Sequence, residues 1–158
     1  MKKIFFVCMC AAVFLTSCGG DSAVKVNETI VAGVDGSFAI LDKATGYIQA
    51  DQYDDAKAHL DSASVYVTAA VGAIEKLENK SAVDFKQSAL DLLKLISTEG
   101  IPAYKQAIDI YLSDTEEQDD YNRATGLIND FIDKVQKSQT NVQQIQVAFA
   151  AKNNVRLR

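Results

Sequence analysis

Apolar residues recur at intervals of three and four along most of this chain, which is the spacing of one face of an α-helix. Acids, lysines and glutamines fill the positions between them. The clearest run predicts a helix over residues 115–151, about 55 Å long, and a second run covers residues 53–77. We call the recurring apolar positions of a run its seam. The seam of the long run consists of Tyr121, Ala124, Ile128, Phe131, Val135, Ser138, Val142, Ile145 and Phe149.

A weaker run of the same kind lies near the start of the chain and ends at Ile48. Gly33 and Gly36 fall inside it, and each glycine costs a helix about 1 kcal/mol relative to alanine. We therefore expect the first helix to begin near Ser37 rather than at Asn27.

The third run contains an irregularity. Its first seam positions are Phe85, Ala89, Leu92 and Ile96. The next seam position is Glu99, and the pattern then resumes one residue out of phase at Tyr104, Ile108 and Tyr111. Because Pro102 lacks a backbone N–H and its ring clashes with the preceding turn, we expect a kink near residues 98–102 or a break into two helices.

Four helical segments with short connections predict an all-α fold: an antiparallel up-down-up-down four-helix bundle over residues 27–152. Its third helix is expected to be kinked near Gly100–Pro102, and residues 153–158 are expected to form a frayed tail. The expected N-caps offer a side-chain oxygen and have an acid three residues later: Asp51, Ser81 and Asp114.

The first eighteen residues follow a different pattern. Lys2 and Lys3 are followed by an apolar run over residues 4–15. Twelve residues are too few to span a bilayer of about 30 Å as a helix, which takes ~20, but they suit the core of a cleaved signal peptide. We predict a signal peptide over residues 1–17; the alternative is an ordinary secretory leader in which Cys18 has no special role.

The Leu15-Thr16-Ser17-Cys18 tetrad resembles the lipobox of bacterial lipoproteins. The resemblance implies that Cys18 is lipidated on sulfur, becomes the first mature residue and is acylated on its new amine. Two or three acyl chains would attach the chain firmly to a membrane, whereas one would be marginal. Residues 18–26 are then the lipidated cysteine and a flexible tether.

The residue after Cys18 is glycine rather than aspartate. In well-studied Gram-negative envelopes an aspartate there resembles an inner-membrane retention signal, so its absence implies an outer-membrane lipoprotein, either periplasmic or surface-facing. The chain as a whole resembles the small helical-bundle surface lipoproteins of unknown function found in Bacteroidota and spirochaetes. This likeness depends on three features: Leu15–Asp21, the run from Phe85 to Leu93 leading into Tyr104–Tyr111, and the length of 158 residues.

The formal net charge of −5 narrows the classes of partner. The first seventeen residues contain two lysines and no acid, so their removal changes the charge to −7. Only the segment Lys152–Arg158 is locally basic, which argues against a nucleic-acid partner, whose phosphates must be neutralised. We expect a mature chain with this negative charge to be held at the membrane by its acyl chains rather than to lie flat on anionic lipid.

The sequence offers few groups for catalysis or metal binding. His59 is the only histidine and has alanine, not glutamate, three residues before it, so the di-iron pattern of helical bundles is missing. No Gly-x-Ser-x-Gly elbow or glycine-rich phosphate loop occurs. We therefore expect a non-enzymatic protein without cofactor or metal, and a half-exposed His59. An acidic cluster lacks the spacing of an EF-hand, so we expect it to stabilise the start of a helix. Its members are Asp114, Glu116, Glu117, Asp119 and Asp120.

One candidate binding site lies at the irregularity of the third helix. Glu99 occupies a position where an apolar residue is expected, and Tyr104 and Tyr111 follow on nearly the same face. A carboxylate and two phenols at a kink could line a small pocket, because buried carboxylates need partners. The alternative is that Glu99 turns to water where the pattern slips.

Two functions are compatible with these features. The first is an envelope-anchored, non-catalytic bundle with a protein-interaction or structural role. If it offers a helical face to an envelope protein partner, we expect an exposed apolar patch drawn from Val65, Tyr66, Val71, Ile101 and Leu127. The second is a small-ligand binder with a pocket near Glu99, Tyr104 and Tyr111. The oligomeric state is left open.

Overall fold

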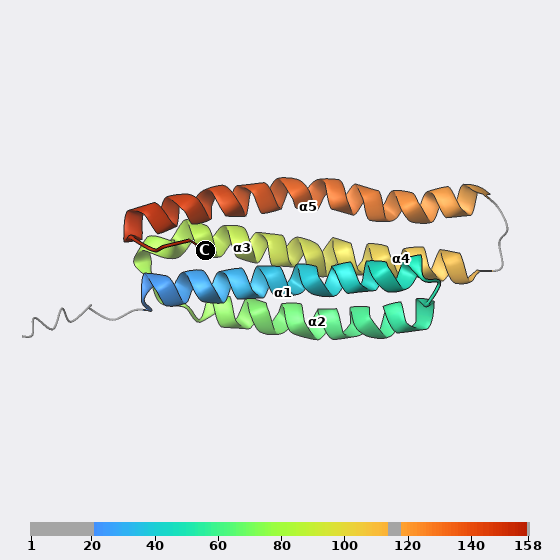
Figure 1. Cartoon of the computed structure of the whole chain (residues 1–158), viewed down its shortest axis with the longest axis horizontal. Helices are drawn as coiled ribbons and strands as arrows, with labels where there is room; N and C mark the ends of the chain where they lie inside the picture. Colours follow the sequence, from blue (N-terminus) through green and yellow to red (C-terminus); the bar gives the residue numbers. More distant parts are fainter. Residues whose placement is uncertain (1–20, 114–117, 158) are drawn as a thin grey trace, which may run out of the picture.

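The computed structural model describes residues 21–113 and 118–157 and is an all-α four-helix bundle, as predicted (Figure 1). No strand occurs in that part of the chain. The third of the four rods is made of α3, a π-helical turn (η2) and α4. The elements are α1 (Ala23–Gln49), α2 (Tyr53–Glu75), the 3-10 turn η1 (Lys80–Ala82), α3 (Val83–Leu95), η2 (Ile96–Gly100), α4 (Ile101–Leu112) and α5 (Gln118–Asn153).

Consecutive rods run antiparallel, and α5 lies along the full length of α3 and α4 (Figure 1). α2 packs against α1 on one side and against α3 and α4 on another. The start of α1, the α2–α3 connection and the end of α5 meet at one end of the bundle, which we call the proximal end. The α1–α2 turn, the end of α4 and the start of α5 meet at the other, which we call the distal end.

The main core is a continuous apolar cluster to which every rod contributes, and a second, smaller cluster joins α4 to α5. Ile30 of α1, Leu60 of α2 and Phe85 of α3 are among its fully buried side chains, and Phe85 lies 5.4 Å, ring to ring, from Phe149 of α5. Burying one such side chain contributes about 1.5–3 kcal/mol. Most predicted seam positions therefore face inward, although Tyr121 does not, and their burial holds the four rods together.

The start of α1 differs from the prediction. The helix begins at Ala23, not near Ser37, and Ser22 is its N-cap, accepting a hydrogen bond from the backbone N–H of Lys25 at 3.2 Å. Val26 is completely buried in the core. The flexible tether predicted to reach residue 26 is therefore too long, because its last four residues are the first turn of α1.

The two glycines of α1 allow close packing on α2 rather than ending the helix. A Cβ on Gly33 would lie 3.2 Å from the Cβ of Ala70. A Cβ on Gly36 would lie 1.9 Å from the hydroxyl oxygen of Tyr66, which crosses α1 and donates a hydrogen bond to the carbonyl of Ala32 at 2.9 Å. The cost of glycine in the helix is offset by the approach of α2.

The prediction that Asp51 caps α2 is wrong. Asp51 has a φ of 57°, the left-handed conformation that commonly follows the end of a helix, and the backbone N–H of Gln52 donates to the carbonyl of Tyr47 at 2.9 Å. Asp51 therefore terminates α1, and Gln52 precedes α2 without a capping side-chain bond. Ser81 likewise does not cap α3, because it lies within η1, and Asp114 lies outside the described residues.

The C-terminal tail is not frayed over its described part. Asn154 is left-handed, with a φ of 53°, and the N–H of Val155 donates to the carbonyl of Ala150 at 2.9 Å. This is a Schellman end, in which Val155 also packs against the core. Residues 154–157 consequently fold back along the bundle (Figure 1).

Candidate functional site

The predicted irregularity of the third rod is the π-helical turn η2. The backbone N–H of Ile101 donates to the carbonyl of Ile96, five residues earlier. A bond of this length inserts one extra residue into the helix, and that insertion accounts for the slip in the apolar pattern. α4 therefore continues from α3 along nearly the same direction (Figure 1), with Tyr104 and Ile108 returned to the core.

Gly100 ends η2 beneath an aromatic ring of α5. A Cβ at this position would lie 2.5 Å from Cζ of Phe131, closer than real Cβ contacts come. Both residues are buried. The glycine is therefore needed for α5 to approach the π turn.

Glu99 points away from the core. Its carboxylate accepts a hydrogen bond from Lys134 Nζ of α5 at 2.6 Å, and the Glu99 side chain is 47% exposed. Hydrogen bonding to this carboxylate raises the pKa of Lys134 above its ordinary value. Glu99 is therefore a surface ion-pair partner where the helical pattern slips, which was the alternative to a pocket residue.

Tyr104 is buried between α1 and α5. Its hydroxyl lies 3.0 Å from Thr45 Oγ1, and its ring meets Phe131 edge to face at 6.2 Å. Thr45 already donates to the carbonyl of Leu41 at 3.0 Å, so Tyr104 is the donor of the shared bond. Burial raises the pKa of the phenol. Tyr104 thus acts as a core residue whose one polar atom is satisfied.

Tyr111 belongs to a cluster of three tyrosines at the distal end, which we call the tyrosine cluster. Its ring stacks on Tyr53 of α2 at 5.7 Å and lies 5.6 Å from Tyr121 of α5. The hydroxyls of Tyr111 and Thr125 lie 3.2 Å apart. Tyr121 is 59% exposed, so the cluster reaches the surface.

Glu99, Tyr104 and Tyr111 therefore do not share a site. Each faces different neighbours, and within residues 21–113 and 118–157 no hydrogen bond or ring contact joins any two of them. Tyr111 also lies about two helical turns beyond Tyr104, or ~10 Å along α4. The π turn restores both tyrosines to the packed faces of the rod but leaves Glu99 outside.

The tyrosine cluster was not anticipated as a unit, because its members are spread over three helices. Tyr121 appeared only as one position of the long seam, and Tyr53 as the first position of α2. Burial and a hydrogen bond to Asp51 at 2.9 Å raise the pKa of Tyr53. Seven described acids lie near this end against four cations, so the surroundings of the aromatic surface have a net negative charge, which we call the acidic rim. The acids are Asp42, Asp51, Asp54, Asp55, Asp109, Asp119 and Asp120, and the cations are Lys43, Lys57, Lys105 and Arg123.

The other residues considered for catalysis or metal binding do not form a common site. Part of the acidic cluster lies outside the described residues; Asp119 and Asp120 occupy the first turn of α5, where Asp120 pairs with Arg123 at 2.9 Å. His59 is partly buried, with its ring edge against Tyr47 at 5.7 Å. Across the described ranges, no three histidine, cysteine or acidic side chains gather in a group that could hold a metal ion.

The predicted apolar patch is not contiguous. Val65 is 72% exposed, whereas Tyr66 lies across Gly36 and Val71 is partly buried. Ile101 is buried because the π turn rotates it inward, and Leu127 packs beside a small distal core formed by Ala107, Ile110 and Ala124. The five residues therefore do not make one docking face.

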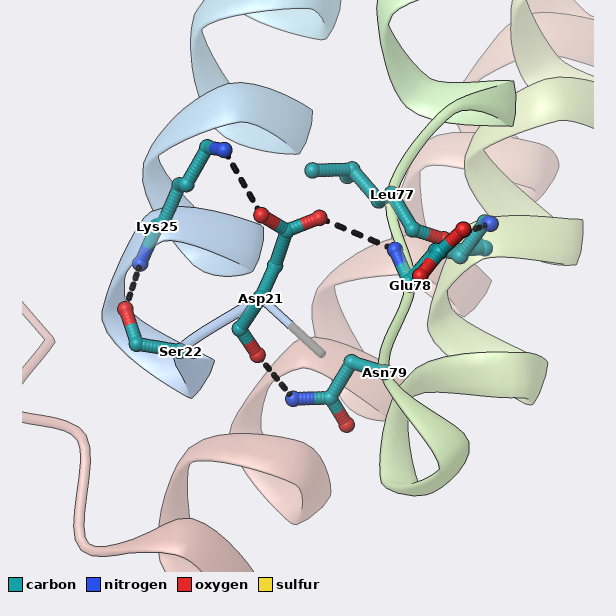
Figure 2. Close-up of polar contacts among 7 residues, drawn as sticks. Asp21, Ser22, Lys25, Leu77, Glu78 and Asn79 are labelled. Atoms are coloured by element: carbon teal, nitrogen blue, oxygen red, sulfur yellow. Dashed lines mark hydrogen bonds and ion pairs between the residues drawn. The ribbon is translucent and has the colours of Figure 1, made fainter. Parts of the chain in front are cut away.

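The best-connected polar site among the described residues is at the proximal end, where Asp21 joins the start of α1 to the connection that follows α2 (Figure 2). Asp21 Oδ1 accepts from Lys25 Nζ at 2.6 Å, and Oδ2 accepts from the backbone N–H of Glu78 at 2.9 Å. The backbone N–H of Asp21 donates to the carbonyl of Glu78 at 2.6 Å, and Asn79 Nδ2 donates to the carbonyl of Asp21 at 2.8 Å. We call this set of bonds the Asp21 clamp.

A second proximal contact fixes the end of α5. Ser81 Oγ donates to Asn153 Oδ1 at 2.9 Å, and Asn153 Nδ2 donates to the carbonyl of Phe149 at 2.8 Å. Together with the Asp21 clamp, these bonds tie the starts of α1 and α3 to the ends of α2 and α5. The proximal end is consequently a rigid platform rather than a set of loose termini.

A shallow groove of about 460 Å³ lies beside this platform, between α1, α5 and the folded-back tail. Its lining is mainly apolar and includes Val24, Val31, Val155 and Leu157. Arg156 and Glu28 also line it. The groove thus adds exposed apolar surface near the first residues of α1.

Comparisons with protein-family models, curated proteins and solved structures find no match to this chain. Within the described part of the chain, no helix combines the length and apolarity needed to cross a bilayer. The function of this chain must therefore be inferred from its sequence pattern and from the geometry of the bundle.

Proposed function

We propose that this chain is a bacterial envelope lipoprotein, fastened to the outer membrane through acyl chains on Cys18, and that it binds a protein partner without catalysing a reaction. The observation that carries the proposal is the position of the leader. A charged start, an apolar run and Leu15-Thr16-Ser17-Cys18 end three residues before the Asp21 clamp. A cleavage before Cys18 would remove the leader and leave the bundle whole.

The geometry supports presentation of the distal end. α1 leaves the Asp21 clamp and runs for 27 residues, about 40 Å, to the α1–α2 turn. A chain anchored at Cys18 thereby holds its tyrosine cluster well away from the attachment point. The hydrogen bonds of the proximal platform join the four rods, so all of them share this orientation.

The tyrosine cluster is the best-supported partner face. Tyrosine is enriched in the energetically important parts of protein interfaces, because it combines a large apolar ring with a polar tip. Tyr121 exposes most of its surface, and Leu112 at the end of α4 is 46% exposed. The acidic rim favours a partner that is basic around an apolar centre.

The small-ligand alternative has no such support. It required Glu99, Tyr104 and Tyr111 to converge, and these side chains face different neighbours. Partner binding is therefore the function that we propose.

Photo-crosslinking in the source bacterium tests the partner face. A photoreactive phenylalanine analogue in place of Tyr121 should form a discrete adduct with one envelope protein. The same analogue in place of Asp91, exposed on α3, is the matched control and should form none. Equal adducts at both positions, or none at Tyr121, would contradict the proposal.

A further inference from the structure

We infer that the proximal end of the bundle binds the headgroups of an anionic bilayer, so that the anchored protein stands end-on on the membrane. This inference rests on the proposed anchor at Cys18 and adds to it an orientation and a lipid chemistry. The occupant of the proximal surface is the bilayer itself.

The chain between the anchor and the bundle is short. Three peptide links join Cys18 to Asp21, so their Cα atoms lie no more than about 11 Å apart. Asp21 is fixed to the α2–α3 connection by three hydrogen bonds of 2.6–2.9 Å. The eight-residue tether expected from the sequence would have allowed any orientation, whereas this short link keeps the proximal end at the bilayer surface.

The two ends of the bundle also differ in charge. The chain is acidic overall, but its proximal segments (residues 21–28, 75–86 and 150–157) have six cations and five acids. The described distal segments (residues 42–57, 105–112 and 118–124) have four cations and seven acids. The proximal cations are Lys25, Lys76, Lys80, Lys86, Lys152 and Arg156. An anionic bilayer therefore attracts the proximal end and repels the distal end.

Two of the proximal cations are engaged within the protein. Lys25 and Asp21 neutralise each other in an ion pair, and Lys86 Nζ donates hydrogen bonds to the carbonyls of Glu75 and Leu77. Lys80, Lys152 and Arg156 are exposed to solvent. Each lysine or arginine near an anionic surface contributes about 1 kcal/mol, which is roughly a fivefold change in binding.

Apolar surface is exposed at the same end. Val24, in the first turn of α1, is 51% exposed, and Val83, at the start of α3, is 64% exposed. The apolar groove lined by Val155 and Leu157 lies beside Val24. Exposed apolar side chains flanked by cations suit the boundary between headgroups and acyl chains, and at this end they come within reach of the anchored residue.

The test uses the full chain, expressed in a bacterium, purified in detergent and reconstituted into vesicles with about one-third anionic lipid. A fluorophore is placed on Ala151→Cys at the proximal end or on Gln49→Cys at the distal end, both exposed positions. Energy transfer to a headgroup dye reports the height of each label. We expect strong transfer from residue 151 and almost none from residue 49, about 40 Å away along the bundle.

Charge reversal then tests the lipid chemistry. Lys80→Glu with Lys152→Glu should weaken the end-on state at least ~25-fold and bring the residue-49 label closer to the bilayer. The matched control, Lys43→Glu with Lys137→Glu, changes the net charge equally at exposed positions away from the proximal end and should leave both label heights unchanged.

The outcomes separate this inference from the proposed function. A chain that carries no acyl mass and does not stay with vesicles overturns both. An acylated chain whose labels give equal transfer lies flat and overturns only the end-on orientation. If the acylated chain stands end-on but neither charge-reversed pair changes the label heights, the headgroup contact is overturned. It is also overturned if the end-on orientation appears only when a second protein is present.

Discussion

Asp21 Oδ2 accepts a hydrogen bond from the backbone N–H of Glu78 at 2.9 Å, although 57 positions separate the two residues in the chain. The contact is reciprocal, because the N–H of Asp21 donates to the carbonyl of Glu78. It joins the start of α1 to the connection that follows α2. The described part of the segment that the sequence pattern predicted to be a tether, residues 21–26, is thereby part of the folded bundle.

The first prediction concerns the ionisation of Asp21. The hydrogen bond from Lys25, and then that from Glu78, lower the pKa of the carboxyl below its ordinary value of 3.8. A lowered pKa stabilises the fold above pH 3.8, and this contribution is lost as the pH falls through the lowered pKa. We expect Asp21→Asn to be less stable than the wild type at pH 7 and the difference to narrow below about pH 4.

Thermal unfolding measured over a series of pH values checks this prediction. Asp133→Asn, on the exposed face of α5, controls for the change in net charge. A gap between Asp21→Asn and the wild type that stays constant down to pH 2 would show that the carboxylate does not contribute through its charge.

The second prediction concerns Gly100 under Phe131. Gly100→Ala should destabilise the bundle by about 1–3 kcal/mol, because the new methyl group overlaps a buried ring. Gly72→Ala is the matched control, since a Cβ there meets nothing within 4 Å, and it should stabilise α2 by about 0.4–1 kcal/mol. Denaturant unfolding measures both values, and a shift of the same sign in the two variants would refute the packing argument.

The arrangement of helices could be predicted from the sequence because burial of an apolar stripe determines it. The slip between Ile96 and Tyr104 marked the place of the irregularity, since one inserted residue shifts the pattern by one position, but the structure has a π turn there instead of the predicted kink at the proline. Gly33 and Gly36 do cost the helix stability, but it was wrong to conclude from this cost that the first helix begins after them. Their benefit depends on Ala70 and Tyr66 of another helix, and a pattern along one segment carries no information about that approach.

The candidate site was less predictable for the same physical reason. Glu99 was singled out because it broke a seam, but the π turn rotates it toward Lys134 and water. The tyrosine cluster and the Asp21 clamp are each built from residues far apart in the chain, so no local motif marks them. Asp51 looked like an N-cap by residue type, although its left-handed φ makes it the end of α1.

The third prediction concerns the buried bond between Tyr104 and Thr45. Tyr104→Phe should cost about 1 kcal/mol of unfolding free energy, because the Thr45 oxygen loses its donor in a partly buried position. Thr45→Val added to this variant should cost less than it does alone. A double-mutant cycle measures the coupling, and strictly additive effects would show that the two hydroxyls contribute independently.

The fourth prediction concerns the left-handed residue after α5. Asn154→Val should destabilise the folded-back tail by about 1–2 kcal/mol, because a β-branched side chain disfavours a φ of 53°. Asn154→Gly should be neutral or stabilising. Amide exchange of Val155, whose N–H donates to Ala150, reports the change directly. Equal protection in the two variants would contradict the Schellman assignment.

The most direct test of the proposed anchor is the intact mass of the protein extracted from bacterial membranes with detergent. We predict a chain that begins at Cys18 and is heavier than the residues from 18 to 158 by a diacylglyceryl group and an amide-linked acyl chain. Cys18→Ser should lose that added mass and the need for detergent. A mass equal to the unmodified polypeptide, with or without its leader, would contradict the anchor and the function proposed from it.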